Sequence, residues 1–236
     1  MSHSGSRAKS APITRDEVER AALFDMDGTL VDTNYFHAVS WWEAFRQAGH
    51  TVPMADIHRC IGMGSDHLLE RLLGEDRDRN EDDAISNAHK ALYGAYGPAL
   101  APLDGAADLL RAVAARGFRV VLATSADSKE LAVMRAALDA DDVIADATSK
   151  DDVSASKPAP DLVAQALDRA GVGPDRAVFV GDTVWDIKAA AKAGVPCVAL
   201  LSGGISRAEL EEAGAAAVHR DPRDVLASLD SSTVWR

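Results

Sequence analysis

The sequence predicts an α/β fold in which a Rossmann-like parallel sheet carries an inserted α-helical cap. Short apolar runs alternate with Ala- and Leu-rich stretches of helical length along most of the chain. This alternation is typical of a parallel sheet covered by helices on both faces. One long segment, residues 33–102, contains no convincing strand pattern. We therefore expect it to be a separate helical unit inserted after the first strand.

Length and composition indicate a globular protein with an acidic balance. The chain has 236 residues, a net charge of −12 and a hydrophobic content of 47%, which suffices for one substantial core and a small accessory domain. The acidic balance argues against a general nucleic-acid or anionic-membrane binder, and no apolar run reaches transmembrane length. Two lone cysteines, Cys60 and Cys197, and the lack of a signal-peptide pattern in the first twenty residues indicate a reducing, cytoplasmic location.

The first strand carries the most informative motif. Residues 21–24 are apolar and lead into two carboxylates one residue apart, Asp25 and Asp27, followed by Gly28 and Thr29. Because side chains alternate along a strand, the two carboxylates point to the same side, and they repel one another unless a cation or a proton separates them. The motif suits an Mg²⁺ site with a carboxylate nucleophile and a neighbouring acid/base. A simple strand-to-turn junction would use the same residue types.

Four further strands and four helices are expected after the helical segment. The predicted strands cover residues 118–123, 143–145, 177–180 and 195–200. The predicted helices cover residues 105–116, 128–140, 159–170 and 183–193. Gly117, Gly171 and Gly194 follow three of these helices, where glycine commonly ends a helix. Ser206 and Glu209 have the spacing of a capping box that begins a later helix.

The segment 33–102 is expected to hold three or four helices and to act as a lid. The first carries apolar side chains at helical spacing and stops near Gly49, and others are expected at residues 53–61, 65–73 and 80–96. An ornamental helical subdomain is the plain alternative. The cap side chains that could face a cleft are His37, Trp41, Trp42, Arg46, Arg59, His67 and Arg71.

For the cap tryptophans and for Arg59, the sequence is consistent with two roles each. Trp41 and Trp42 either pack the cap core, which we favour, or stack on a ligand. Arg59 lies near a Gly-Met-Gly joint and either selects a carboxylate or second phosphate of the substrate or is simply solvated.

Three further motifs lie where predicted strands end. Thr124 and Ser125 offer hydroxyl groups that suit an anion, although a helix N-cap explains Ser125 equally well. Lys157 precedes a proline-started helix and either neutralises phosphate oxygens or is an ordinary solvated lysine. Asp182 and Asp186 share a helix face and can converge on one cation, although Asp182 could merely cap the following helix. The order of these motifs, each at the carboxyl end of a strand, favours one site at one edge of the sheet.

Together the motifs resemble those of the haloacid dehalogenase-like superfamily, in the helical-cap group that includes phosphoglycolate phosphatases and β-phosphoglucomutase. The resemblance covers about residues 20–220. It implies the strand order 3-2-1-4-5, with the strand before Asp25 between those that end at Thr124 and Asp182. The expected divisions of the chain are a disordered tail at residues 1–19, an α/β core at 20–32 and 103–236, and the cap at 33–102.

The resemblance also implies a role for each motif residue. Asp25 would be the nucleophile that forms an aspartyl-phosphate, and Asp27 the general acid and base. The carboxylates of Asp25 and Asp182 and the main-chain carbonyl of Asp27 would bind Mg²⁺. Asp186 would be a further ligand or an orienting group. The residues that hold the phosphoryl group would be Thr124, Ser125, Lys157 and Gly28.

The implied function is a magnesium-dependent phosphatase, a phosphoric monoester hydrolase, for a small phosphorylated metabolite. Dehalogenases of this kind lack the second acid, Asp27, and a phosphonatase needs a cap lysine for which Lys90 is poorly placed. A phosphosugar mutase of the β-phosphoglucomutase type is an alternative, although such mutases commonly have an acidic residue where this chain has Gly181. A non-catalytic phosphometabolite-binding module is another. The motifs leave open phosphoglycolate, a sugar phosphate or a nucleotide as substrate, and a monomer or a homodimer.

Overall fold

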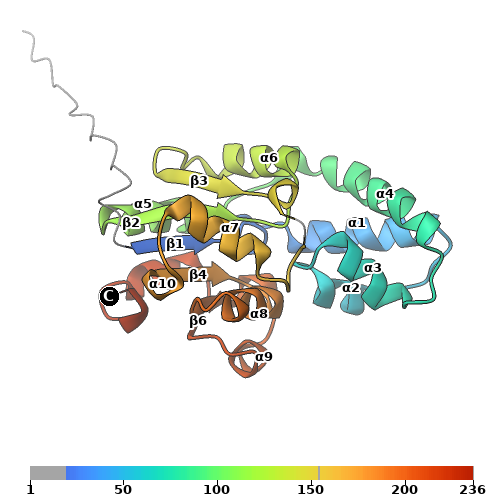
Figure 1. Ribbon diagram of the computed structural model, residues 1–236. Helices are drawn as coiled ribbons and strands as arrows, with labels where there is room; N and C mark the ends of the chain where they lie inside the picture. The colour runs from blue at the N-terminus through green and yellow to red at the C-terminus, as the bar shows by residue number, and fades with distance from the viewer. Residues whose placement is uncertain (1–19, 154, 236) are drawn as a thin grey trace, which may run out of the picture.

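The centre of the molecule is a six-stranded parallel sheet in the order β3-β2-β1-β4-β5-β6 (Figure 1). The computed structural model describes residues 20–153 and 155–235, so the expected tail at residues 1–19 lies outside the described residues. The strands are β1 (Arg20–Phe24), β2 (Phe118–Ala123), β3 (Ile144–Thr148), β4 (Ala177–Gly181), β5 (Cys197–Leu200) and β6 (Ala217–His219).

The strand order expected for the first five strands is confirmed, and β6 extends the sheet beyond β5. The strand β6 lies outside the strands that the sequence pattern predicts. This strand has three residues, all only half-buried, so its apolar run is too short to stand out from the surrounding chain.

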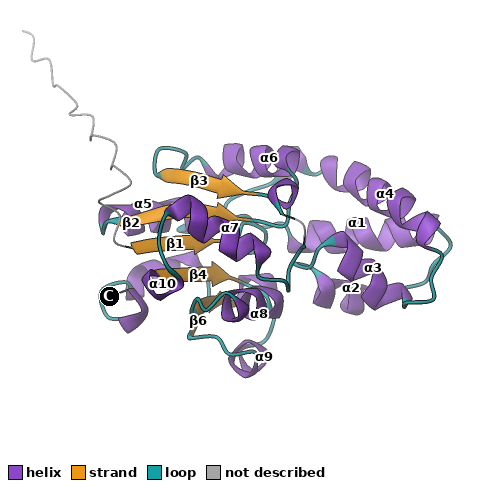
Figure 2. Cartoon of the chain, viewed as in Figure 1, coloured by secondary structure: helices purple, strands orange, loops and turns teal. Residues whose placement is uncertain are grey.

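Helices cover both faces of the sheet, as the alternation predicted (Figure 2). The helices packed on one face are α5 (Ala106–Ala115), α6 (Ser128–Leu138) and α10 (Pro222–Ser228). Those packed on the other face are α7 (Asp161–Ala170), α8 (Val184–Lys192) and α9 (Arg207–Glu212). Because strand side chains alternate, Phe24 and Leu122 belong to the first core, and Leu23 and Val121 to the second.

The ends of these helices follow the local signals in the sequence. Gly171 is the C-cap of α7, and Gly117 and Gly194 lie just beyond the C-caps of α5 and α8. The expected capping box begins α9, where Ser206 Oγ accepts a hydrogen bond from the main-chain N–H of Glu209 at 3.4 Å.

The helical segment after β1 forms a unit with its own hydrophobic core, which includes Trp41, Phe45 and Leu68. Its helices are α1 (Asn34–Gln47), α2 (Met54–Cys60), α3 (Ser65–Leu73) and α4 (Asp82–Gly94). The strands of the sheet point toward this unit, which we call the cap (Figure 1). The two chain segments that join it to the sheet domain pair with each other at Val31 and Pro102.

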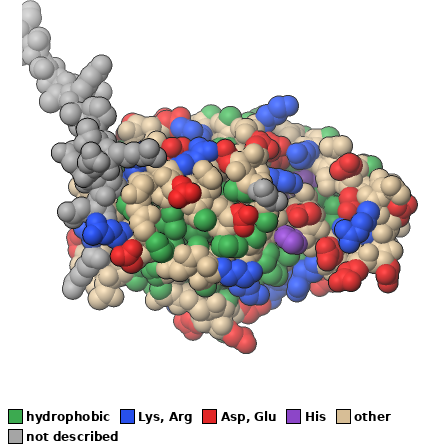
Figure 3. Space-filling view, in the orientation of Figure 1, with side chains coloured by type: hydrophobic (Ala, Val, Ile, Leu, Met, Phe, Trp, Pro, Cys, Tyr) green, Lys and Arg blue, Asp and Glu red, His purple; other side chains and the backbone are tan. Residues whose placement is uncertain are grey.

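Three general features bear on the sequence-based expectations. Cys60 in the cap and Cys197 in β5 are both buried and free. Among the described residues, we find no helix with the length and apolarity needed to cross a bilayer. On the face seen in Figure 3, Lys and Arg side chains lie interspersed with Asp and Glu.

Candidate active site

Four charged side chains from the predicted motifs meet at the carboxyl ends of β1 and β4. Asp25 follows β1, Asp182 follows β4, Asp186 lies in the first turn of α8, and Lys157 lies in the loop before α7. All four are buried, with at most 2% of any of them exposed. Because β1 and β4 are neighbours in the sheet, groups far apart in the sequence come together at one edge, as expected for a doubly wound fold.

Lys157 joins two of the carboxylates. Its Nζ lies 2.8 Å from Asp25 Oδ1 and 2.7 Å from Asp186 Oδ1. Burial alone would lower the pKa of Lys157, but the charges of Asp186 and Asp25 outweigh burial and raise the pKa. Burial raises the pKa of Asp25 to about 7, an effect that Lys157 opposes and Asp186 strengthens. Lys157 is therefore a buried ion-pair partner and not a solvated surface lysine.

Asp182 is held by neutral donors. Thr29 Oγ1 donates a hydrogen bond to Asp182 Oδ1 at 2.9 Å, and Asn34 Nδ2 donates one to Oδ2 at 2.7 Å. Burial raises the pKa of Asp182 well above its ordinary value, and repulsion from Asp186 adds to the effect. The alternative that Asp182 caps α8 is wrong, because the side chain of Thr183 caps that helix.

The acidic cluster fits a hard divalent cation. Asp25, Asp182 and Asp186 each offer one carboxylate oxygen, and these oxygens lie within 4.8 Å of one another. Lys157 pairs with only two of these three buried carboxylates, and uncompensated buried charge is unfavourable. The buried Oδ1 of Asn34, whose amide nitrogen bonds Asp182, has no hydrogen-bond partner among the described residues. An oxygen donor set of this kind is what Mg²⁺ prefers.

Asp27 faces a different environment, toward the cap. Thr33 Oγ1 donates a hydrogen bond to Asp27 Oδ1 at 2.7 Å, and His37 Nε2 lies 3.1 Å from the same oxygen. Burial alone would raise the pKa of Asp27, but His37 and Thr33 outweigh burial and lower the pKa. The Asp27 carboxylate is not part of the acidic cluster, so its expected contribution to metal binding is limited to the main-chain carbonyl.

The hydroxyl motif after β2 lies beside Asp27 and the cap. Thr124 Oγ1 accepts a hydrogen bond from the N–H of Ala126 at 3.1 Å and lies 3.4 Å from Asp27 Oδ2. Ser125 Oγ lies 3.5 Å from the carbonyl oxygen of Gly62 in the cap. Asp127, and not Ser125, caps α6.

Gly28 leaves the space that the side chains of Asn34 and Asp182 occupy. It has a φ of +67°, which favours glycine, and a Cβ atom there would lie 2.4 Å from both Asn34 and Asp182. Its N–H donates a hydrogen bond to the carbonyl of Val31 at 2.8 Å. Gly28 does not line the cavity described next, and its expected role in phosphate binding stays a prediction.

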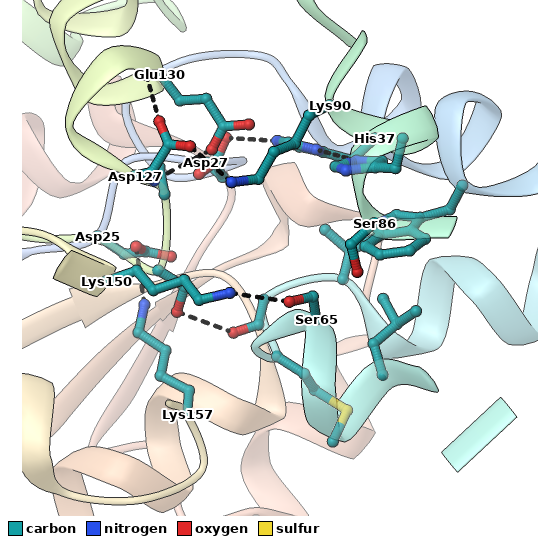
Figure 4. Close-up of a pocket in the computed structure, with 18 residues that line it drawn as sticks. Asp25, Asp27, His37, Ser65, Ser86, Lys90, Asp127, Glu130, Lys150 and Lys157 are labelled. Atoms are coloured by element: carbon teal, nitrogen blue, oxygen red, sulfur yellow. Dashed lines mark hydrogen bonds and ion pairs between the residues drawn. The ribbon is translucent and has the colours of Figure 1, made fainter. Parts of the chain in front are cut away.

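A cavity of about 80 Å³ lies between the end of the sheet and the cap, and Asp25 and Asp27 both line it (Figure 4). The other core residues with polar side chains in its wall are Ser125, Asp127, Glu130, Lys150 and Lys157. The cap residues with polar or aromatic side chains in its wall are His37, Trp41, Ser65, Ser86, His89 and Lys90.

Of the seven cap side chains considered from the sequence, only His37 and Trp41 line the cavity. Trp41 is 4% exposed, belongs to the cap core and stacks on His89 with ring centroids 4.1 Å apart, so it packs the cap and faces the cleft at once. Arg59 pairs instead with Glu209 at 2.9 Å, and both side chains are partly exposed.

Sequence reasoning missed several residues of the site. No recognised motif includes Asn34, Ser65 or Lys150. His89 lies in the middle of α4, where no local signal marks it. For Lys150, a signal was available, because it lies in the same strand-to-helix connection as Lys157. Connections that follow the strands of α/β sheets are where ligands bind.

Comparisons with known proteins agree with the family resemblance that the motifs indicate. A model of the haloacid dehalogenase-like hydrolase family matches residues 19–194. A phosphoglycolate phosphatase from Rhodospirillum rubrum is 32% identical over 216 residues, which cover 86% of this chain and 87% of the relative.

Solved structures give the same result. A hydrolase from Pseudomonas syringae has a TM-score of 0.85 at 34% identity, over 89% of this chain and 98% of that one. A β-phosphoglucomutase from Clostridium difficile has a TM-score of 0.75 at 19% identity, over 86% and 91% of the two chains, a likeness of fold alone. The chain therefore belongs to the haloacid dehalogenase-like hydrolases, the family that its motifs resemble.

Proposed function

We propose that this protein is a magnesium-dependent phosphatase that hydrolyses a small phosphorylated metabolite through an aspartyl-phosphate intermediate. The observation that carries the proposal is the pair Asp25 and Asp27 in the wall of one cavity, with Lys157 at 2.8 Å from Asp25. The relative from Rhodospirillum rubrum is a phosphoglycolate phosphatase, which makes 2-phosphoglycolate the first candidate substrate. The free thiols of Cys60 and Cys197 support a cytoplasmic location.

In the first step, a carboxylate oxygen of Asp25 attacks phosphorus and the bond from phosphorus to the ester oxygen breaks. Lys157 is placed to offset the negative charge that develops on the phosphoryl oxygens. Two hydroxyl groups could donate to the phosphoryl oxygens. One belongs to Ser125, which lines the cavity, and the other to Thr124, which lies beside Asp27. In the second step, water attacks the phosphoryl group and restores the Asp25 carboxylate.

Asp27 would move the proton in both steps. His37 and Thr33 lower the pKa of Asp27 against the effect of burial, which favours the ionised carboxylate. A phosphate dianion that enters the cavity raises the pKa of a nearby carboxylate by repulsion, which favours the protonated form that donates to the leaving oxygen. The ionised form then accepts the proton of the attacking water.

The cation would be held by Asp25, Asp182 and, by family resemblance, the main-chain carbonyl of Asp27. When bound, Mg²⁺ supplies positive charge that lets an anionic phosphoryl group approach the anionic nucleophile. Asp186 has both oxygens engaged, one at 2.7 Å from Lys157 Nζ and the other accepting hydrogen bonds from Thr183 N and Oγ1. These contacts favour an orienting role for Asp186 toward Lys157 over direct ligation.

The lack of space for a side chain at Gly181 favours a phosphatase over a mutase. A Cβ atom at this position would lie 2.6 Å from the side chain of Asp186, so the acidic residue common in family mutases does not fit without rearrangement. A non-catalytic binding module is disfavoured because every group of the four motifs is present.

The test is phosphate release from an aryl phosphate and from 2-phosphoglycolate, with and without Mg²⁺, by wild type, Asp25→Asn and a control, Asp175→Asn, at an exposed site. We expect turnover that requires Mg²⁺, a loss on the order of 10³-fold or more in Asp25→Asn, and no change in the control. Binding of phosphometabolites without turnover, or full activity in Asp25→Asn, would contradict the proposal.

A further inference from the structure

In the described part of the chain, three lysines line the cavity, and one of them has no carboxylate partner there. Lys157 pairs with two buried carboxylates, and Lys90 Nζ lies 2.9 Å from Asp127 Oδ2. Within residues 20–153 and 155–235, Lys150 makes no ion pair, and its Nζ donates a hydrogen bond to the hydroxyl of Ser65 at 2.9 Å. The positive charge of Lys150 is therefore available to a ligand.

The histidines of the cavity do not offer a comparable charge. Burial lowers the pKa of His89 well below 6.5, and electrostatic repulsion from His37, Lys90 and Lys150 adds to the effect, so His89 is neutral at pH 7. His37 is engaged with Asp27 at 3.1 Å. By elimination, Lys150 is the cation of the cavity whose charge no neighbouring acid offsets among the described residues.

Lys150 also lies where core and cap meet. It begins the short 3-10 helix η4 (Lys150–Asp152) that follows β3, whereas Ser65 is the first residue of α3 in the cap. Figure 4 shows its amine directed at Ser65, in the cavity that Asp25 also lines. The N-terminal end of α3 carries partial positive charge, which adds to the lysine. A negative group placed there would contact both halves of the molecule.

We propose that Lys150 binds a carboxylate of the substrate and so selects short phosphorylated acids. The inference rests on the proposed phosphatase function and names its substrate class. The cavity of about 80 Å³ has room for roughly five to eight water-sized groups. A phosphoryl group joined to a two-carbon acid comes closer to this size than a sugar ring or a nucleoside does. The selective cation is then on the core and not Arg59, which pairs with Glu209 outside the cavity.

The test compares two substrates that differ only in the group that Lys150 would bind. These are 2-phosphoglycolate, with its carboxylate, and 2-hydroxyethyl phosphate, with a neutral hydroxyl in its place. We expect wild type to prefer 2-phosphoglycolate in kcat/KM. Lys150→Gln keeps a donor for Ser65 but loses the charge, and should raise KM for 2-phosphoglycolate on the order of 10- to 100-fold, the effect of a lost charge-assisted hydrogen bond. Its kcat/KM for 2-hydroxyethyl phosphate should fall much less, because this ester lacks the carboxylate.

Three further variants separate charge recognition from cap positioning. Lys150→Arg keeps the charge and should restore most of the preference for 2-phosphoglycolate. Ser65→Ala removes the cap partner but leaves the lysine, and should keep the preference. Lys129→Gln, an exposed lysine outside this cavity, should behave as wild type. Calorimetric binding of both compounds to Asp25→Asn should show the same preference without turnover, and Lys150→Gln in that background should abolish it.

Two results would overturn the inference while leaving the proposed function intact. One is a wild type that turns over both esters equally well. The other is a Lys150→Gln variant that loses activity equally on both, which would make Lys150 a link between cap and core only. If wild type hydrolyses no phosphomonoester, the proposed function fails. The calorimetric comparison then decides the inference alone, and equal binding of both compounds would overturn it.

Discussion

The two walls of the cavity carry different chemistry. The core wall is ionic and backed by Asp182 and Asp186, with Asp25 and Lys157 at most 2% exposed. The cap wall is aromatic, with Trp41 stacked on a neutral His89 at 4.1 Å between ring centroids. The core wall holds charge in place for a reaction, while the cap wall excludes water and shapes the space. The core therefore supplies both the reacting groups and the selecting charge of Lys150, while the cap closes the site around them.

The two walls are also held by different forces. The core wall continues the sheet, since the N–H of Asp25 donates to the carbonyl of Val180 at 2.9 Å. The cap wall meets the core through side-chain contacts, among them Lys150 with Ser65 and His58 Nε2 with the carbonyl of Gly203 at 2.9 Å. Changes to the core wall should therefore alter both the free energy of unfolding and phosphate release. Changes to the cap wall should be able to alter one of these without the other.

Removal of the positive charge of Lys157 should destabilise the core wall. In Lys157→Met, the carboxylates of Asp25 and Asp186 lose the only positive charge that contacts them among the described residues. We expect a loss of about 3–5 kcal/mol in the free energy of unfolding and loss of phosphate release, measured by urea unfolding and by assay. Lys188→Met, at a lysine outside the cluster, is the matched control. Unchanged stability in Lys157→Met would mean that the core wall does not depend on this ion pair.

The cap wall should show its own dependence on pH through His89. Burial lowers the pKa of His89 well below 6.5, so below pH 6.5 the unfolded chain binds a proton there that the folded chain does not. The free energy of unfolding should therefore fall as the pH falls through this window, by up to about 1.4 kcal/mol per pH unit. His89→Gln should remove this part of the slope, as measured by urea unfolding at several pH values. His67→Gln, at a partly exposed cap histidine, should not, and equal slopes in all three proteins would contradict a neutral His89.

The smallest effect is expected outside the cavity. Arg59→Ala removes the ion pair with Glu209 between cap and core, whose side chains are 47% and 40% exposed. Exposed ion pairs contribute little to stability, so the unfolding midpoint and the KM for 2-phosphoglycolate should both stay close to wild type. A selective rise of KM for 2-phosphoglycolate in this variant would return the anion-selecting role from Lys150 to Arg59.

Sequence reasoning was most successful on the core wall, for a physical reason. Strand ends in a parallel sheet converge on one edge, so Asp25, Thr124 and Asp182 could be placed together once the strands were recognised. The edge strand β6 could not be predicted in the same way. Its three half-buried residues follow the register of β5 and leave little pattern of their own.

The cap wall could be predicted only in part. Helical periodicity puts His37 and Trp41 on α1, but it does not say which face of the helix meets the cavity. That choice depends on how α1 packs on α4 and how the cap docks on the core. The stacking of Trp41 on His89 and the contact of Lys150 with Ser65 arise from this docking, and neither pair has a local signal in the sequence.

The role of Asp25 on the core wall as acceptor of a phosphoryl group can be tested by measuring the melting temperature with Mg²⁺ and beryllium fluoride. This compound mimics a phosphoryl group on an aspartate, and a ligand that binds only the native state raises the melting temperature. We predict a clear rise in wild type and none in Asp25→Asn. No rise in wild type at saturating concentrations, or an equal rise in both proteins, would contradict the assignment of Asp25 as the nucleophile.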